Sequence, residues 1–344
     1  MLKNCFLCLT VIIALTFTAC DKDHEEPQTS ISIYMEIDSA GDVNIYDIPV
    51  MDRYLFGYPA WISDDYLLYS KAKLYRGSLD SYDYQQLLPD NIDCFGYGIC
   101  HSVARQKIWF CNSDGIWSCN FAGGDITFVS PTPIKEMQLS SHGNFLIGYR
   151  IDRSQSLCLV DLATGIMEEQ STSHSVHKAF YNEDLQLISY LTYVRETENS
   201  FQVRVRSKDG SSELIAIDFG NISIRNFQVS ASGRYVAGMA SENGSISYPL
   251  YIHDLQTGET NDLGLVRSFQ MLAQGDQMIF LPADGRYFKV SKYDFDTGGI
   301  TDLHSGYLHD YRYYYLYKLI VREDGEKIRI YGWGKLEIED RRIL

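Results

Sequence analysis

The chain has 344 residues, of which 45% are apolar and 22% are charged, so it can bury a large core and is not disordered over most of its length. It carries 30 lysines and arginines against 45 aspartates and glutamates, which gives a net charge of −15. This negative charge repels nucleic-acid phosphates and anionic lipid headgroups, so we expect no nucleic-acid partner.

The first predicted element is a signal peptide over residues 1–19. Lys3 precedes an apolar run over residues 6–17, which suits a signal-peptide core and is short of the ~20 residues that span a bilayer as a helix. The run leads into Thr18-Ala19-Cys20, which resembles the lipobox of bacterial lipoproteins. The resemblance implies that Cys20 is lipidated and becomes the mature N-terminus. The alternative is an ordinary secretory signal with an incidental cysteine.

Residues 20–30 form a predicted flexible, acidic tether that cannot fold alone. An acidic run just after the cysteine also resembles the export signal of surface-displayed lipoproteins in some Gram-negative bacteria, and a plain solvated spacer is the alternative. No later apolar stretch approaches spanning length, so we expect the body to reach the membrane through its lipid. The predicted location is the outer membrane, on its periplasmic face or at the cell surface.

The predicted folded domain covers residues 31–344 and opens with two strands, at 33–37 and 43–48, around a Ser-Ala-Gly-Asp turn. Five cysteines remain after the signal peptide and Cys20 are set aside, an odd number. Cys94 and Cys100 flank a short glycine-bearing loop and are the preferred disulfide candidates, with Cys111 and Cys119 as the alternative pair.

Two turn signals repeat along the rest of the chain. An apolar strand ending in Asp-(Leu/Phe)-x-Thr-Gly occurs over residues 159–165, 252–258 and 292–298. A Ser/Asp/Gly turn feeding an apolar strand precedes it and is clearest at 140–148 and 230–238. Glycine supplies positive φ in such turns, and Tyr, Val, Ile and Phe favour strands. The period of about 40–47 residues suits the blades of a β-propeller, with almost no helix.

These residues resemble the β-propeller repeats of TolB-like periplasmic proteins, which also occur in prolyl-oligopeptidase-type peptidases. The resemblance covers about residues 60–340 and is best at 140–165 and 230–258, although Ser141 and Ala231 replace the family's proline in the first turn. There is no room for the α/β domain of a TolB-like protein or the hydrolase domain of a peptidase. We therefore expect an all-β, single-domain propeller.

Seven predicted repeat starts, near residues 63, 104, 141, 183, 231, 274 and 323, favour seven blades, with six or eight as alternatives. The last unit has too few residues for four strands. Because propellers commonly complete the last blade with N-terminal strands, which hides exposed sheet edges, we expect this closure here.

Catalytic motifs are missing, including Gly-x-Ser-x-Gly, His-Glu-x-x-His and the phosphate-binding glycine loops. We predict no cofactor and no metal. His174 and His177 with His101 or His142 are a weaker alternative as metal ligands, and a calcium loop at 294–302 is weaker still.

Tyrosine is over-represented, with 26 residues, six of them in the segment 307–317. Tyrosine can stack on sugar rings or form a protein hot spot, whereas packing between sheets is the structural alternative. The candidate ligand-binding residues are Tyr307, Tyr311, Tyr313, Tyr315 and Tyr317.

We expect a lipid-anchored, non-catalytic binding module for a glycan or an envelope protein. The alternative is a polysaccharide lyase or glycosidase whose active site lies on the loop face, and the fold alone does not choose between them.

Overall fold

The structure is all-β in the part of the chain that it describes. The computed structural model describes residues 31–37, 43–48, 60–61, 66–70, 73–78, 84–95, 98–194, 200–221, 223–241, 248–272, 275–283, 287–307, 315–321 and 328–334. The predicted signal peptide, Cys20 and the tether lie outside these residues. None of the described residues forms an apolar helix long enough to cross a membrane.

Four antiparallel sheets each contain four strands that follow one another along the chain. The first sheet contains β3 (Ala60–Trp61), β4 (Tyr66–Ser70), β5 (Leu74–Ser78) and β6 (Tyr84–Gln86). The second contains β7 (Ile99–Ser102), β8 (Lys107–Asn112), β9 (Gly115–Asn120) and β10 (Thr127–Ser130). The third contains β11 (Ile134–Leu139), β12 (Phe145–Arg150), β13 (Ser156–Asp161) and β14 (Met167–Ser171). The fourth contains β15 (Ser175–Asn182), β16 (Leu187–Val194), β17 (Ser200–Ser207) and β18 (Glu213–Asp218).

The next sheet has seven strands because one long strand serves two neighbours. Its members are β19 (Ser223–Val229), β20 (Tyr235–Ser241), β21 (Tyr248–Asp254), β22 (Thr260–Met271), β23 (Gln277–Pro282), β24 (Tyr287–Asp294) and β25 (Ile300–Tyr307). The first half of β22 pairs with β21 up to Val266, and its second half pairs with β23 from Val266 onward. One strand is therefore the last of one four-stranded unit and the first of the next.

The remaining sheet joins the two ends of the described chain. It has the order β2-β1-β27-β26 and consists of β1 (Ile31–Ile37), β2 (Val43–Ile48), β26 (Tyr315–Val321) and β27 (Ile328–Gly334). β1 pairs with β27 over seven residues, from Ile31 opposite Gly334 to Ile37 opposite Ile328. The two predicted N-terminal strands thus complete a sheet begun by C-terminal strands.

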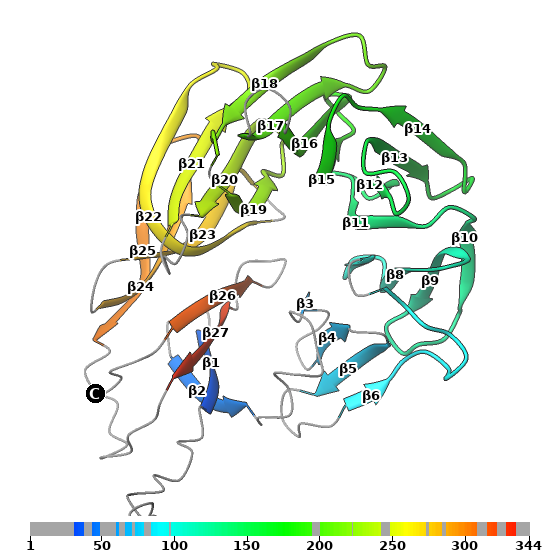
Figure 1. The fold of residues 1–344 in the computed structure, drawn as a ribbon. Coiled ribbons are helices and arrows are strands. Elements are labelled where there is room, and N and C mark those ends of the chain that lie inside the picture. Colours follow the sequence, from blue (N-terminus) through cyan, green and yellow to red (C-terminus); the bar gives the residue numbers. More distant parts are fainter. Residues whose placement is uncertain are drawn as a thin grey trace, which may run out of the picture.

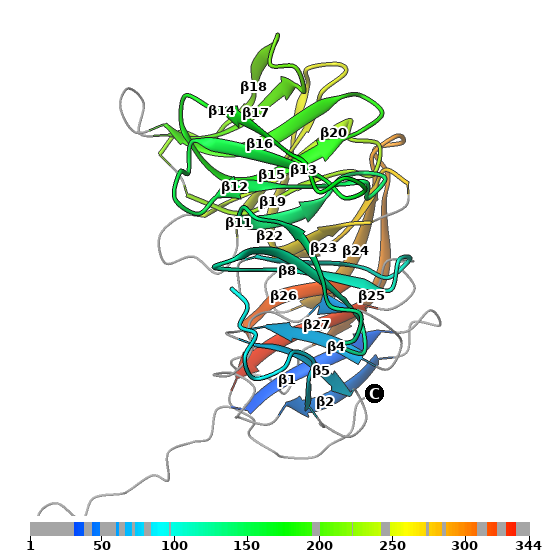
Figure 2. The ribbon, with the colours of Figure 1, turned by 90° about the vertical axis from the view of Figure 1, so that its right-hand side faces the viewer.

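The sheets stand around a common centre, and β3, β11, β15, β19 and β26 are the strands of their sheets that lie nearest to it (Figure 1). Contacts between these inner strands run from β7 to β11, β15, β19, β22 and β26, and β26 also contacts β3. Figure 2 shows the same sheets from the side, with the N-terminal strands β1 and β2 beside β26 and β27.

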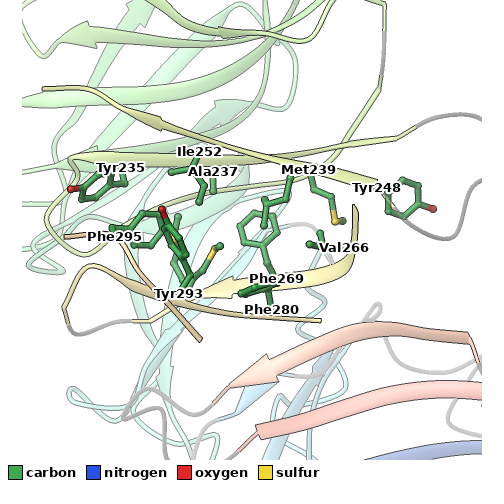
Figure 3. Close-up of a cluster of buried hydrophobic side chains, with 13 residues drawn as sticks. Tyr235, Ala237, Met239, Tyr248, Ile252, Val266, Phe269, Phe280, Tyr293 and Phe295 are labelled. Carbon is green, nitrogen blue, oxygen red and sulfur yellow. The ribbon is translucent and has the colours of Figure 1, made fainter. Parts of the chain in front are cut away.

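The core lies between neighbouring sheets. One buried cluster joins side chains of β20 and β21 to side chains of β22, β23 and β24, so the two halves of the seven-stranded sheet pack face to face (Figure 3). Similar clusters join the second sheet to the third and the third to the fourth. Alternation along the strands directs apolar side chains into these layers.

The Asp-x-x-Thr-Gly signals form tight turns. Asp161 Oδ1 accepts hydrogen bonds from the backbone nitrogens of Ala163, at 2.8 Å, and Thr164, at 2.9 Å. Gly165 then adopts a φ of 71°, which glycine allows without steric cost. This Asx geometry explains why the repeat requires an aspartate and a glycine at fixed spacing.

The Ser-Gly signals link one sheet to the next. The carboxylate of Glu183, in the turn after β15, accepts hydrogen bonds from Ser140 Oγ and from the backbone and side chain of Asn144. In the same way, Ser232 donates to Asp276 from both its backbone and its hydroxyl. These turns therefore hold neighbouring sheets together at one face of the ring, which we call the turn face.

The predicted disulfide between Cys94 and Cys100 is absent, since both residues are free thiols. Cys94 belongs to the cluster between the first two sheets, whereas Cys100 packs against the cluster between the second and third. The two side chains thus serve different apolar layers. Cys111 and Cys119, the alternative pair, are also free and buried.

Candidate functional site

Five of the inner strands contain an irregularity in their pairing with the next strand, whereas the described residues of β3 and β7 pair regularly. In β15, β19, β22 and β26 one extra residue interrupts the pairing with the second strand of the unit. The extra residues are His177, Arg225, Arg267 and Tyr317. In β11 the irregularity falls between Lys135 and Gln138. Bulges re-aim side chains and are frequent next to active sites.

All these bulges point to the same end of the ring. Each inner strand runs toward the turn face, so a bulge near its start lies toward the opposite face, which we call the loop face. The loop face carries the connections that enter the inner strands. Catalytic and binding residues of scaffold proteins often lie on such connections.

A short sequence pattern accompanies the bulges. An aliphatic residue is followed by a basic or aromatic one, then a polar or charged one, then an apolar one. The five copies are Ile134-Lys135-Glu136-Met137, Val176-His177-Lys178-Ala179, Ile224-Arg225-Asn226-Phe227, Val266-Arg267-Ser268-Phe269 and Leu316-Tyr317-Lys318-Leu319. The sequence analysis missed this signal, because each copy is only four residues long and contains no glycine turn.

The bulge in β11 depends on a glycine in the paired strand. A Cβ added to Gly148 of β12 would lie 2.4 Å from the carbonyl oxygen of Lys135 and 3.3 Å from Ile134 Cδ1. Glu136 adopts a φ of 50°, which side-chain-bearing residues seldom take. Gly148 therefore makes room for an irregular backbone at Glu136.

Two oppositely charged groups of the neighbouring inner strands β11 and β15 interact. Burial raises the pKa of Glu136, and the positive charges of Lys178 and Lys135 oppose that rise. Burial lowers the pKa of Lys178, and the charge of Glu136 opposes that fall. Both side chains are half-buried, so each charge is partly removed from water.

Other groups at the bulges are also partly desolvated. Burial lowers the pKa of Arg267 in β22 and of His177 in β15. The His177 ring lies beside the Phe201 ring at a centroid distance of 5.8 Å. Clusters of ionisable groups with perturbed pKa values are candidates for functional sites.

Hydrogen bonds fix β22 against β19. The side-chain amides of Asn226 and Gln228 donate to the carbonyl oxygen of Phe269, at 3.1 and 3.2 Å. Gln228 Oε1 accepts a hydrogen bond from the backbone nitrogen of Met271 at 2.8 Å. The backbone that carries Arg267 is therefore held rigidly, as a binding site requires.

The charge of these positions differs from that of the whole chain. The second position of consecutive copies holds Lys135, His177, Arg225 and Arg267, and the third holds Lys178 in β15, with Glu136 as the single acid among the five copies. The chain as a whole has a net charge of −15. A basic set within an acidic protein favours an anionic ligand over a basic partner.

The structure describes only some of the tyrosines predicted to bind a ligand. Tyr311 and Tyr313 lie outside the described residues, and for Tyr307, Tyr315 and Tyr317 the structure describes the strands alone. Tyr317 is the extra residue of the β26 bulge, in register with Arg267 and His177. The prediction that these tyrosines bind a ligand remains open.

The histidines weighed as metal ligands do not gather among the described residues. His142 Nε2 instead lies 2.8 Å from Asp184 Oδ1 at the turn face, and this carboxylate raises the pKa of His142. No group of three or more His, Cys, Asp or Glu side chains in the described part of the chain is placed to hold a metal ion. Asp294, of the weighed calcium loop, accepts hydrogen bonds from Thr297.

Neither a family model nor a curated protein matches the chain. Solved structures match its fold. An oligogalacturonate lyase in complex with manganese is 14% identical, with a TM-score of 0.55, covering 82% of this chain and 89% of that one. An oligogalacturonate lyase from Vibrio parahaemolyticus is 11% identical, with a TM-score of 0.58, covering 90% and 98%. The tricorn protease is 11% identical, with a TM-score of 0.53, covering 90% of this chain and 33% of its own.

These neighbours have β-propeller folds, and the chain is likewise an all-β protein of β-propeller fold. At such identities the likeness concerns the fold alone. It confirms the prediction of an all-β propeller fold and leaves the subfamily open.

Proposed function

We propose that this protein is a lipid-anchored envelope propeller that binds an acidic glycan through the basic residues at its inner-strand bulges. The observation that carries the proposal is the recurrence of a basic residue at the bulge of three successive inner strands, namely His177, Arg225 and Arg267, with Lys178 next to His177. A ligand with several carboxylates would meet one cation per strand. Basic groups that are partly desolvated bind carboxylates more strongly than fully hydrated ones.

We further infer a ring of seven blades closed by the N-terminal strands. Counting β22 once in each of its two units divides the seven-stranded sheet into two blades of four. With the other five sheets this makes seven. The pairing of β1 with β27 supports the closure.

The proposed envelope location rests on Cys20. Labelling with a palmitate analogue should mark the wild type and leave Cys20→Ala unmarked. The Cys20→Ala protein should also lose its membrane association, because its only proposed anchor is the lipid. Equal labelling of both proteins would refute the lipoprotein assignment.

Calorimetric titration of the soluble body, starting at Ser30, with galacturonate trimers and with a neutral trimer of the same length tests the proposed ligand class. We expect binding of the acidic trimer alone, weakening as salt is added. Arg267→Gln and Lys178→Gln should each weaken it about tenfold or more, as loss of a charge-assisted hydrogen bond does. Arg153→Gln, which removes an exposed arginine between β12 and β13, is the matched control and should bind normally.

Equal binding of acidic and neutral trimers, or normal binding by both variants, would refute this function. Binding that depends on a protein partner would support the envelope-protein alternative. That outcome would be detected by repeating the titration with envelope extracts depleted of glycans.

The second candidate is a lyase acting on the same ligand class. The observation that favours it is a lysine of lowered pKa, Lys178, which interacts with the carboxylate of Glu136 on the neighbouring inner strand β11. In such a reaction a neutral base takes the proton from C5, the electron pair of the C5–H bond forms the C4=C5 double bond as the C4–O4 bond breaks, and O4 leaves with a proton supplied by water. Arg267 would pair with the uronate carboxylate.

Turnover distinguishes the two candidates. A lyase would generate ultraviolet absorbance from the new C4=C5 double bond, and Lys178→Gln would abolish it. Binding of the trimer with no change in absorbance over many hours would exclude the lyase and support the non-catalytic binding module.

A further inference from the structure

Glu136 is exceptional in its backbone conformation. Among the described residues, the side-chain-bearing ones with positive φ are Gln106, Asp125, Glu136 and Gln186. Of these, Glu136 alone lies within a strand, β11 (Ile134–Leu139). Such conformations cost on the order of 1–3 kcal/mol and cluster at functional sites.

Within the described part of the chain, Glu136 also has no hydrogen-bond or close ion-pair partner. Among the described residues its half-buried carboxylate accepts no hydrogen bond, and the Lys178 ammonium on the adjacent strand β15 donates none. A partly buried charge without a hydrogen bond is costly. The charges of Lys178 and Lys135 oppose the effect of burial on Glu136, and the charge of Glu136 opposes it on Lys178, so both groups can accept a new hydrogen-bond partner.

Glu136 also differs in charge from the residues at the same position in the other copies of the four-residue pattern. Glu136 occupies the position that Lys178, Asn226, Ser268 and Lys318 occupy in the other four copies. A carboxylate at this position is the same chemical group that an acidic ligand would present to the neighbouring cations. Gly148, across the bulge, is the residue that makes room for it.

We propose that Glu136 is a resident counter-ion, which holds the place of a ligand carboxylate beside Lys178 in the free protein and lowers the affinity for acidic glycans. This inference rests on the proposed function. It implies that a ligand binds only if its carboxylates together interact with the cations more strongly than the Glu136 carboxylate does. The site would therefore select oligomeric over monomeric uronates, since several cations are then engaged at once.

The test uses two variants that remove the carboxylate in different ways. Glu136→Gln keeps the side-chain shape, whereas Glu136→Gly also relieves the left-handed backbone and so carries little risk of misfolding. Both should bind galacturonate trimer about tenfold more tightly at pH 6, the size of one screened charge interaction. They should also bind the monomer detectably. Glu168→Gln, on the outer strand β14, is the matched control and should bind like the wild type.

A double-mutant cycle separates this role from a purely structural one. In the Lys178→Gln background, removal of the Glu136 carboxylate should improve binding much less, because the cation that it neutralises is gone. Wild-type or weaker binding by both Glu136 variants, with Arg267→Gln still impaired, would overturn the counter-ion proposal alone. Absence of any trimer binding by the wild type and by the Glu136 variants would overturn the proposed function and, with it, this inference.

Discussion

Substitution of Glu183 by glutamine should weaken the link between the third and fourth sheets. Oε1 of Glu183 accepts hydrogen bonds from Ser140 Oγ at 2.5 Å and from the backbone nitrogens of His142 and Asn144, both at 3.2 Å. Oε2 accepts one from Asn144 Nδ2 at 2.9 Å. Glutamine retains an acceptor at one position only and turns the other into a donor that faces the Asn144 amide.

The expected cost follows from these four contacts. Three become neutral hydrogen bonds of about half the strength, and the fourth is lost. Three of the four contacts are exposed, so the low end of the range applies, about 0.5 kcal/mol for each neutral bond, and the free energy of unfolding should fall by about 2.5 kcal/mol. Glu168→Gln is the control, because its carboxylate lies 3.7 Å from Lys208 Nζ at an exposed site and should change stability by less than about 1 kcal/mol.

Urea unfolding at a series of pH values measures both the loss of stability in Glu183→Gln and its dependence on pH. Burial alone would raise the pKa of Glu183, but the hydrogen bonds from Ser140, Asn144 and His142 together hold it below its ordinary value. The carboxylate therefore stabilises the fold above pH 4.5, and this contribution is lost as the pH falls through the lower, folded pKa. The difference between wild type and Glu183→Gln should be full at pH 7 and shrink in acid. Equal midpoints at pH 7, or a difference that grows in acid, would refute the role of this carboxylate.

Three further predictions concern the fold. Gly148→Ala should lower stability by about 1–3 kcal/mol and impair ligand binding, because its Cβ would meet a carbonyl oxygen at 2.4 Å; unchanged binding would contradict the link between the bulge and the site. Reducing agent should leave the melting temperature unchanged, and Cys94 should resist alkylation in the folded protein since burial raises its pKa to about 12; a lower melting temperature would indicate a disulfide. Deletion of residues 21–50 should be strongly destabilising because it uncovers the edge of β27, whereas deletion of 21–29 should be nearly silent; equal melting would show that β1 contributes nothing to the ring.

Local sequence patterns were enough to predict the turns and the strand arrangement of the fold. The Asp-x-x-Thr-Gly and Ser-Gly signals depend on hydrogen bonds within a few residues, so their spacing predicts the turns directly, as at Asp161 and Gly165. The pairing of N-terminal strands with the last strands could be predicted as well, because a sheet that lacks strands at one end of the chain needs them from the other.

The site could not be predicted in the same way. Each bulge is defined by a shift in pairing between two strands, and that shift leaves only a weak trace in four residues. Glu136 becomes notable through its φ and through Lys178 on another sheet, about 40 residues away in the sequence, which no local pattern records. The disulfide prediction failed for a related reason. Closeness of Cys94 and Cys100 in sequence did not reveal that they pack into different layers.

The shared strand β22 has a consequence for how the ring opens. β10 and β11 are separate strands, as are β14 and β15, whereas Thr260–Met271 continues from one unit into the next as a single strand. Neither unit can lose its edge strand without breaking the ladder of the other. The seven strands from β19 to β25 should therefore exchange their amide protons as one cooperative block, slower than the separate four-stranded sheets, and local unfolding should begin elsewhere in the ring.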